Sequence, residues 1–411
     1  LADFLKIHYA IETNVNHLRT RTEIPLPESG SLRDSETSAQ QKSIQVRPRG
    51  TCKDESSSLQ VPRRRPHILL IVDVPDWIFA RHCQMFQRYL CDEFDFTIKV
   101  QGEPFREDDF DLIYPLEWNL VEAGQIGNPR KYITGIRSHV WWPDLNFAKF
   151  TQFLATHFQR VHVVSKRLLD IFKPALPGVI YVTHGVDTEF FTSSTRADQS
   201  GRKLRLGWAG NRNQPAKGFK EFVEPLGEIP GVELVFCGYA DRNLTIEEMR
   251  DFYNSLDAYI CASGNNEGNN NSLMEAASMK RAIITTDNGT VPEYLVDGKN
   301  ALIVPREREA FVHAVEKLRD NPSLRMKLGK AARKAVTSAW DWRDRSEDYR
   351  HLFREALQTV QAAAPQPIAQ PAPVKKARAI QDVSQQEPPE CTYEIIRKVI
   401  QAGMYPEAMM A

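Results

Sequence analysis

Two polar loops in the second half of the sequence combine small residues, cations and carboxylates. The first loop, residues 209–218, follows the apolar run Leu204–Trp208 and has the sequence AGNRNQPAKG. Its small residues, among them Gly210, let a ligand approach the backbone, and the fixed cations Arg212 and Lys217 can neutralise a diphosphate without a metal. The alternative is an ordinary polar turn with solvated charges.

The second loop follows the apolar run Ala258–Ala262 and places two carboxylates eight residues apart. Residues 263–275 have the sequence SGNNEGNNNSLME. Asn271 or Ser272 is expected to cap the helix that follows, and the free N–H groups of that helix attract phosphate. We expect Glu275, on this helix, to accept hydrogen bonds from a ribose, and Glu267, in the loop, to lie nearer a reacting sugar.

The elements around these loops alternate between strand-length apolar runs and helical patterns, which predicts α/β halves with mostly parallel, open sheets. In such sheets, ligands bind beyond the carboxyl ends of the strands. Residues 67–73 (HILLIVD) form a continuous apolar run that is typical of a central strand buried on both faces. We expect further strands at 96–100, 112–114, 139–142, 161–164, 180–183, 204–208, 232–237, 258–262, 282–286 and 301–304, and helices at 79–90, 219–226, 246–253, 272–279, 309–319 and 323–339.

The flanks of the chain have a different composition. Residues 23–65 and 362–389 are rich in Ser, Pro, Gln or Ala, and they cannot bury enough apolar surface to offset the entropy of ordering, so we expect both to be disordered. Residues 1–21 and 391–411 could each form a helix. The cluster at 63–65 (RRR) is most simply a solvated edge, and the alternative is contact with an anionic membrane surface.

The bulk composition favours an ordinary cytoplasmic protein. The formal net charge is zero, which gives no support for a nucleic-acid partner. No apolar run approaches the roughly 20 residues of a membrane-spanning helix, and we expect no signal peptide. The six cysteines show no metal-binding or redox spacing, and Cys237 and Cys261 lie in apolar runs, so we expect them to be buried thiols.

These motifs resemble the retaining glycosyltransferases of the GT-B fold, specifically glycosyltransferase family 4. The family pattern is a Glu, seven residues and a second Glu in a context like E-G-x-x-N-S-L-x-E-A, which residues 267–276 match. The similarity continues through 283–287, 291–293 and 298–302. Residues 184–187 (HGVD) resemble the segment at the end of the family's first domain, Lys217 its diphosphate-binding lysine, and Trp342 the aromatic residue before its last helix.

The resemblance implies two Rossmann-like domains whose sheets face each other across a cleft. The expected parts are a mostly disordered segment (1–65), an acceptor domain (66–187), a nucleotide-sugar donor domain (188–340), a helix that crosses back (341–361) and a flexible tail (362–411). The implied reaction transfers a sugar to a glycan or lipid-linked acceptor with retention of anomeric configuration and without a metal or other cofactor. The protein would then be cytoplasmic, with peripheral contact at the inner face of the membrane as an option.

The resemblance also implies roles for individual residues. Glu267 and His139 would act at the donor sugar, although His139 could equally be a core or strand-end histidine. The residues implied to bind the donor are Gly210, Asn211, Arg212, Lys217, Asn271, Ser272, Leu273 and Glu275. Trp77, Trp141 and Trp142 could line an acceptor cleft, but core packing is the simpler explanation of each.

The sequence departs from the family pattern in places, and other functions stay open. Asn211 stands where the family has Arg, and Arg212 comes one position later. Lys280, Ala282 and Thr290 replace common Gly or Pro residues. A sugar-nucleotide epimerase of the same fold and a non-catalytic sugar-nucleotide-binding or scaffolding module are the alternatives. A dinucleotide-dependent dehydrogenase is disfavoured because the glycine fingerprint is missing.

Overall fold

The computed structural model describes most of the chain between residues 64 and 362. His139, Trp141, Trp142, the expected strand at 139–142 and the expected terminal segments lie outside the described residues. The described ranges are 64–75, 77–138, 146–193, 202–238, 243–264 and 267–362.

The first half is an α/β unit in which all the paired strands run parallel. Its strands hydrogen-bond in the orders β2-β1-β3 and β4-β5-β6, and a parallel bridge between Ile113 and Tyr132 links the two groups. Its main elements are β1 (His67–Val72), α3 (Ile78–Leu90), β2 (Asp95–Val100), β3 (Leu112–Pro115), β4 (Ile133–Ile136), α4 (Phe147–His157), β5 (Arg160–Val163), α5 (Lys166–Phe172) and β6 (Ile180–Tyr181).

The expected central strand is β1, which lies between β2 and β3 and is buried from Ile68 to Val72. Burial on both faces explains its unbroken apolar run. Strand β4 has no counterpart among the expected strands, because Ile133–Ile136 contains Thr134 and Gly135 and has no continuous apolar run.

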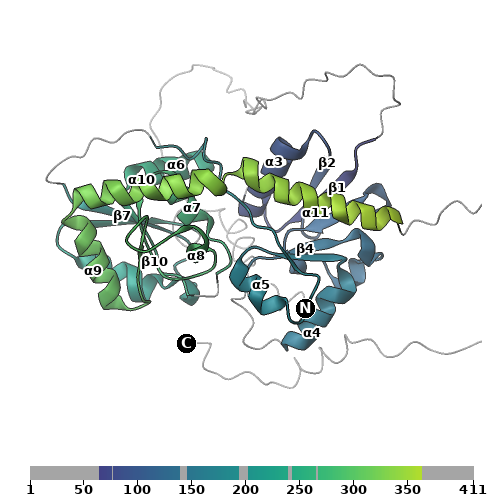
Figure 1. Ribbon diagram of the computed structural model, residues 1–411, viewed down its shortest axis with the longest axis horizontal. Helices are drawn as coiled ribbons and strands as arrows, with labels where there is room; N and C mark the ends of the chain where they lie inside the picture. The colour runs from purple at the N-terminus through teal and green to yellow at the C-terminus, as the bar shows by residue number, and fades with distance from the viewer. Residues whose placement is uncertain are drawn as a thin grey trace, which may run out of the picture. The chain divides into compact units, whose positions relative to one another are not determined.

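The second half is a five-stranded parallel sheet with helices around it (Figure 1). Its strand order is β11-β10-β9-β7-β8, so β7 and β9 are neighbours although they are far apart in sequence. Its main elements are β7 (Leu204–Ala209), β8 (Val232–Cys237), α6 (Ile246–Ser255), β9 (Ala258–Cys261), α7 (Asn271–Ser278), β10 (Ala282–Thr285), α8 (Val291–Tyr294), β11 (Leu302–Ile303), α9 (Arg308–Arg319) and α10 (Pro322–Ala339).

The helix expected at 219–226 is wrong as a regular α-helix. The segment is a π-helical turn, Phe219–Val223, followed by a 3-10 helix, Glu224–Glu228. Pro225 has no N–H for the helical ladder, which explains why the hydrogen bonding changes there.

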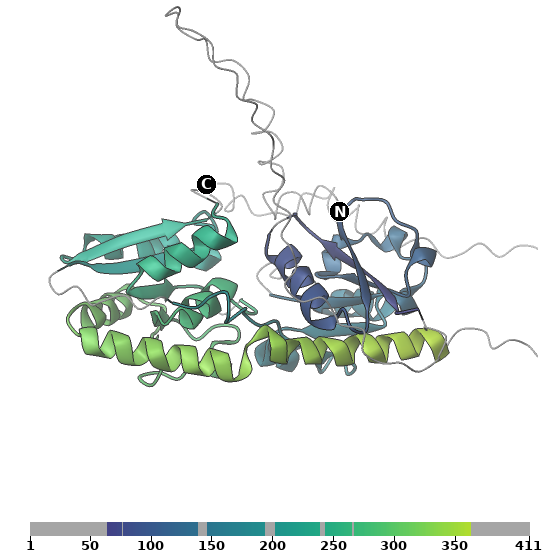
Figure 2. The same cartoon turned by 90° about the horizontal axis from the view of Figure 1, so that it is seen from above.

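The last described helix, α11 (Trp342–Ala362), packs its buried side chains into the core of the first half. Trp342 begins this helix, and with Tyr349 and Phe353 it belongs to the same buried cluster as β1 and Phe86. Figure 2 shows this yellow-green helix beside the half that carries α3.

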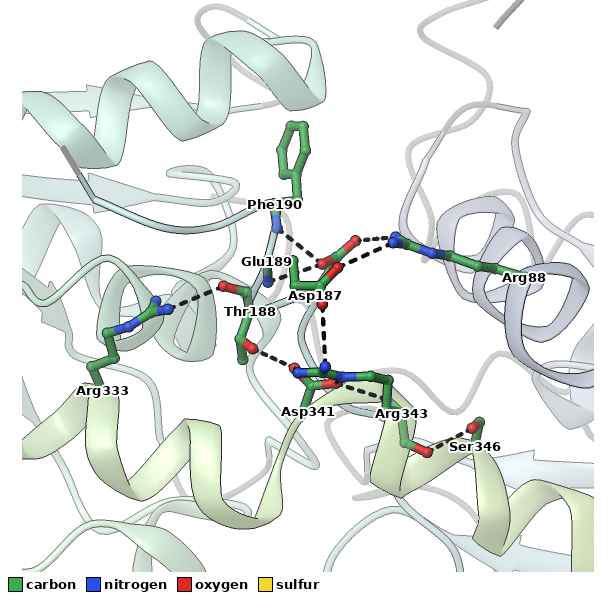
Figure 3. Close-up of polar contacts among 9 residues, drawn as sticks. All are labelled: Arg88, Asp187, Thr188, Glu189, Phe190, Arg333, Asp341, Arg343 and Ser346. Carbon is green, nitrogen blue, oxygen red and sulfur yellow. Dashed lines mark hydrogen bonds and ion pairs between the residues drawn. The ribbon is translucent and has the colours of Figure 1, made fainter. Parts of the chain in front are cut away.

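Two segments that connect the halves lie side by side, as Figure 3 shows. Val186 and Asp341 form a parallel bridge. The Thr188 hydroxyl donates to the buried Asp341 carboxylate, which also accepts from the Arg343 Nε at 2.9 Å. Arg88 of α3 donates to Asp187 at 2.8 Å. The two connecting segments therefore form a hydrogen-bonded junction between the halves. The domain boundaries expected at 187/188 and 340/341 stay predictions.

Two expectations about composition can be checked. Cys237 and Cys261 are buried thiols, as expected. None of the helices in the described ranges combines the length and the apolar character that a bilayer crossing requires.

Candidate active site

The two polar loops, residues 209–218 and 263–275, begin at the same edge of the second sheet. The first follows β7 and the second follows β9, and these strands are parallel neighbours with Leu206 opposite Ala258. Their carboxyl ends therefore point the same way, so residues 50 positions apart in sequence can meet.

Lys217 and Glu267 meet in an ion pair between the Lys217 Nζ and a Glu267 Oε1. Their side chains are 23% and 13% exposed. Burial alone would lower the pKa of Lys217, but the Glu267 carboxylate outweighs burial and raises that pKa above its ordinary value. The site therefore holds a charged ammonium at neutral pH.

The backbone around Lys217 is fixed from two sides. Lys217 ends the 3-10 turn Pro215–Lys217, and Gly218 continues it at φ +65°, where an added Cβ would lie 2.8 Å from the Ala262 carbonyl oxygen. The Arg306 guanidinium donates to the carbonyls of Ala262 (3.0 Å) and Pro215 (3.2 Å). Arg306, which the sequence analysis did not single out, thus ties the first loop to the end of β9.

The rest of the first loop is held by its own hydrogen bonds. The Gly210 N–H donates to the Cys237 carbonyl at 3.0 Å, and the Asn211 side chain accepts from the Asn213 N–H at 3.0 Å. Arg212 is half-buried on the same turn. The structure thus brings Lys217 to Glu267, and a phosphate role for Gly210, Asn211 and Arg212 stays a prediction.

Glu275 is a buried carboxylate, 6% exposed. Its Oε2 accepts from the Tyr253 hydroxyl at 2.8 Å, and its Oε1 lies 3.7 Å from a guanidinium nitrogen of Arg81. Burial raises the pKa of Glu275, against the opposing effects of Arg81 and the Tyr253 hydroxyl. A carboxylate held this way can accept further hydrogen bonds from hydroxyl groups.

The expected caps of α7 are wrong by one or two positions, because Asn270 is the cap. Its side-chain oxygen accepts from the Leu273 N–H at 3.2 Å and from the Ser272 hydroxyl at 2.9 Å. The Leu273 side chain is fully buried. Since the first-turn N–H groups of a helix lack intrahelical partners, those of Asn271 and Ser272 are the groups that α7 can offer an anion.

Gly268 lets the second loop touch the first half of the chain. A Cβ on Gly268 would lie 1.7 Å from the Arg137 carbonyl oxygen, so only glycine fits. Glu267, which precedes Gly268, forms an antiparallel bridge with Ser138, which follows Arg137. His139 directly follows Ser138 in sequence and lies outside the described residues, so its role stays a prediction.

The expectation of core packing is wrong for Trp77. Its side chain is 43% exposed, immediately before α3. Trp141 and Trp142 lie outside the described residues.

Potential metal ligands, the side chains of His, Cys, Asp and Glu, are spread over the described ranges. Within them, no group of three or more His, Cys, Asp or Glu side chains could hold a metal ion. The expectation of a metal-free reaction stays a prediction.

Two side chains at Glu275 were missed by the sequence analysis. Arg81 comes from the first half and Tyr253 from α6. Each lies in an amphipathic helix among similar residues, so no local pattern in the sequence distinguishes them.

Comparisons with known proteins show similarity to glycosyltransferases. Residues 189–321, which include both loops, match the family described as Glycosyl transferases group 1. An uncharacterized glycosyltransferase of Methanocaldococcus jannaschii is 24% identical over 141 residues, 34% of this chain but only 36% of that protein. A GDP-mannose-dependent monoacylated alpha-(1-6)-phosphatidylinositol monomannoside mannosyltransferase of Corynebacterium glutamicum is 22% identical over 293 residues, 60% of this chain and 77% of that protein.

The fold is also similar to that of solved structures. Anabaena HepE, crystallised with UDP and glucose, superposes with a TM-score of 0.58 at 12% identity, over 71% of this chain and all of that one. This similarity confirms the expected α/β fold with parallel sheets. Residues 189–321 are therefore similar to the glycosyltransferase group 1 family, and the fold of the chain is the α/β fold of GT-B structures.

Proposed function

We propose that this chain transfers a sugar from a nucleotide-sugar donor to a hydroxyl-bearing acceptor, a glycan or a lipid-linked glycan, with retention of anomeric configuration. The observation that carries the proposal is the Lys217–Glu267 ion pair at the strand-end edge of the group 1 domain. In a bound sugar diphosphate, the Lys217 ammonium would contact the phosphate charge and the Glu267 carboxylate would contact the sugar hydroxyl groups.

The proposed donor lies along α7. Lys217 and the N–H groups of Asn271 and Ser272 bind the diphosphate, Glu275 accepts from the ribose hydroxyls, and Glu267 accepts from the sugar. In the transfer step, the bond between the anomeric carbon and the phosphate oxygen breaks while the acceptor oxygen bonds to that carbon from the same face. The acceptor proton passes to the leaving diphosphate, and Lys217 stabilises the charge that develops there.

The nature of the donor has support from similar proteins. HepE was crystallised with UDP and glucose, and the mannosyltransferase of Corynebacterium glutamicum is named as GDP-mannose-dependent. We therefore take UDP-glucose and GDP-mannose as the first donors to test. His139, beside the Glu267 contact in sequence, is proposed to act near the donor sugar.

A thermal-shift comparison tests the donor site. UDP, GDP, UDP-glucose and GDP-mannose are added to the wild type, Lys217→Ala and the matched control Lys220→Ala, whose lysine is exposed on the next turn. A ligand that binds only the folded state raises the melting temperature. We expect at least one compound to stabilise the wild type and the Lys220→Ala variant, and Lys217→Ala to lose most of that shift while its ligand-free melting temperature changes little.

The chemistry is tested with the donor that binds. Release of nucleoside diphosphate and NMR of the new glycosidic bond report transfer and anomeric configuration, and an inverted product would contradict retention. A free, altered sugar without acceptor would indicate an epimerase. Binding without any donor turnover would indicate a non-catalytic module.

A further inference from the structure

The first turn of α3 lies against the first turns of α7. His82 Nε2 is 3.2 Å from the Asn271 side-chain oxygen, and a guanidinium nitrogen of Arg81 is 3.7 Å from Glu275 Oε1. Arg81 and His82 are adjacent on one helix, and Asn271 and Glu275 are one turn apart on the other. These two contacts place a helix of the first half beside the proposed donor site.

The Arg81 guanidinium is held loosely. At 3.7 Å its contact with Glu275 is an ion pair and too long for a hydrogen bond. Its side chain is 20% exposed, and the guanidinium forms no hydrogen bond with any residue in the described ranges. Arg88, two turns along the same helix, donates to Asp187 at 2.8 Å. Arg81 therefore keeps its N–H donors for another partner.

A further cation beside α7 would match the charge of the proposed donor, in addition to Lys217 and Arg212 of the first loop, and Arg81 is such a cation. A sugar diphosphate carries a negative charge on each phosphate, and Lys217 supplies one cation, which is paired with Glu267 as Arg81 is paired with Glu275. His82 adds no charge, because burial and then the charge of Arg137 hold its pKa well below the ordinary value. The N-terminus of α3 also has no side-chain cap, so its free N–H groups add positive potential beside Arg81.

We propose that Arg81 is a phosphate-binding residue of the donor site, contributed by the half of the chain that precedes residue 188. This inference rests on the proposed function. In the ligand-free protein, Arg81 neutralises the buried Glu275. When a nucleoside diphosphate is bound, the ribose hydroxyls donate to Glu275 and the planar guanidinium donates to phosphate oxygens, a geometry that suits Arg better than Lys.

Isothermal titration calorimetry tests the proposal with UDP, GDP, uridine and guanosine as the probes. The proteins are the wild type, Arg81→Ala, Arg81→Gln and the control Arg88→Ala, which removes a cation from the same helix. We expect both Arg81 variants to weaken binding of the nucleoside diphosphate about tenfold or more, as for a lost charge-assisted hydrogen bond. Binding of the nucleoside without phosphate should stay unchanged, and Arg88→Ala should bind like the wild type.

The possible results separate this inference from the proposed function. If the wild type binds neither UDP nor GDP, the donor site itself is wrong. If the wild type binds but both Arg81 variants bind equally well, Arg81 does not touch phosphate and only this inference fails. An equal loss for nucleoside and nucleoside diphosphate would also overturn it, since Arg81 would then act only by positioning Glu275. Arg81→Gln keeps most of the side-chain volume, so it decides the matter if Arg81→Ala unfolds.

Discussion

Replacing Glu117 by Gln should change how the stability of the protein depends on pH. Glu117 follows β3 and is only 2% exposed. Among the described residues it accepts one long hydrogen bond, from the Arg137 N–H at 3.5 Å. Ile71 pairs with Pro115 between β1 and β3, so Asp73 and Glu117 occupy corresponding positions two residues further along these strands.

This environment sets the sign and the size of the effect. Burial raises the pKa of Glu117 from 4.5 to about 8, with a contribution from the charge of Asp73 and against the charge of Arg137. The folded protein keeps a proton on Glu117 that the unfolded chain releases above pH 4.5. The contribution of this carboxyl to the free energy of unfolding is therefore complete below pH 4.5 and is lost as the pH rises to about 8. Between pH 5 and pH 8 the loss amounts to about 4 kcal/mol.

Glu117→Gln removes this loss, because the amide is neutral at every pH and can still accept from the Arg137 N–H. The free energy of unfolding is measured by urea denaturation at half-unit steps from pH 5 to pH 8 for wild type and variant. We expect the variant to match the wild type near pH 5 and to be more stable by about 4 kcal/mol at pH 8. The difference between the two proteins cancels the contributions of the buried histidines.

An exposed carboxylate in the same half provides the control. Glu103→Gln, at an exposed position after β2, should give a difference from the wild type that does not vary with pH. A Glu117→Gln difference that is equally flat would refute the reasoning, because it would mean that the Glu117 carboxyl is ionised in the folded protein.

Two further substitutions test residues that surround the proposed donor site. Tyr253→Phe removes the hydroxyl that donates to Glu275 at 2.8 Å. We expect it to lower the free energy of unfolding, measured by urea denaturation, by about 1–3 kcal/mol. An unchanged free energy of unfolding would mean that another group replaces the hydroxyl. Gly268→Ala would place a methyl 1.7 Å from the Arg137 carbonyl oxygen, so its melting temperature and its affinity for the nucleoside diphosphate should both fall. Gly264→Ala, whose added methyl would meet Ala216 at 3.9 Å, should leave both near wild type, and equal effects of the two glycine variants would argue against a close approach at Gly268.

The sequence alone predicted most strands and helices of the second half, apart from the helix expected at 219–226 and the short helix α8, and the chemistry of its loops stays a prediction. Strands with unbroken apolar runs, such as Ala258–Cys261, appear as expected, because burial on both faces leaves a strong local pattern. The spacing of Glu267 and Glu275 was enough to predict a loop carboxylate and a helix carboxylate, since a helix begins between them.

The sequence alone did not decide which of several equivalent residues caps a helix, or where a short strand without a local pattern lies. Asn269, Asn270, Asn271 and Ser272 are all good helix-capping types, and only the backbone shows that Asn270 caps α7. The short strand Ile133–Ile136 is defined by its parallel partner Arg160–Val163 and not by its own composition.

Only the tertiary structure decided which distant side chains meet. The order of β7 and β9 in the sheet brings Lys217 to Glu267 across 50 residues of sequence, and the packing of α3 on α7 brings Arg81 to Glu275. The physical reason is that hydrophobic periodicity reports on the burial of each element against its surroundings, whereas the pairing of charges depends on strand order and on the contact between the two halves. Neither leaves a trace in the local sequence.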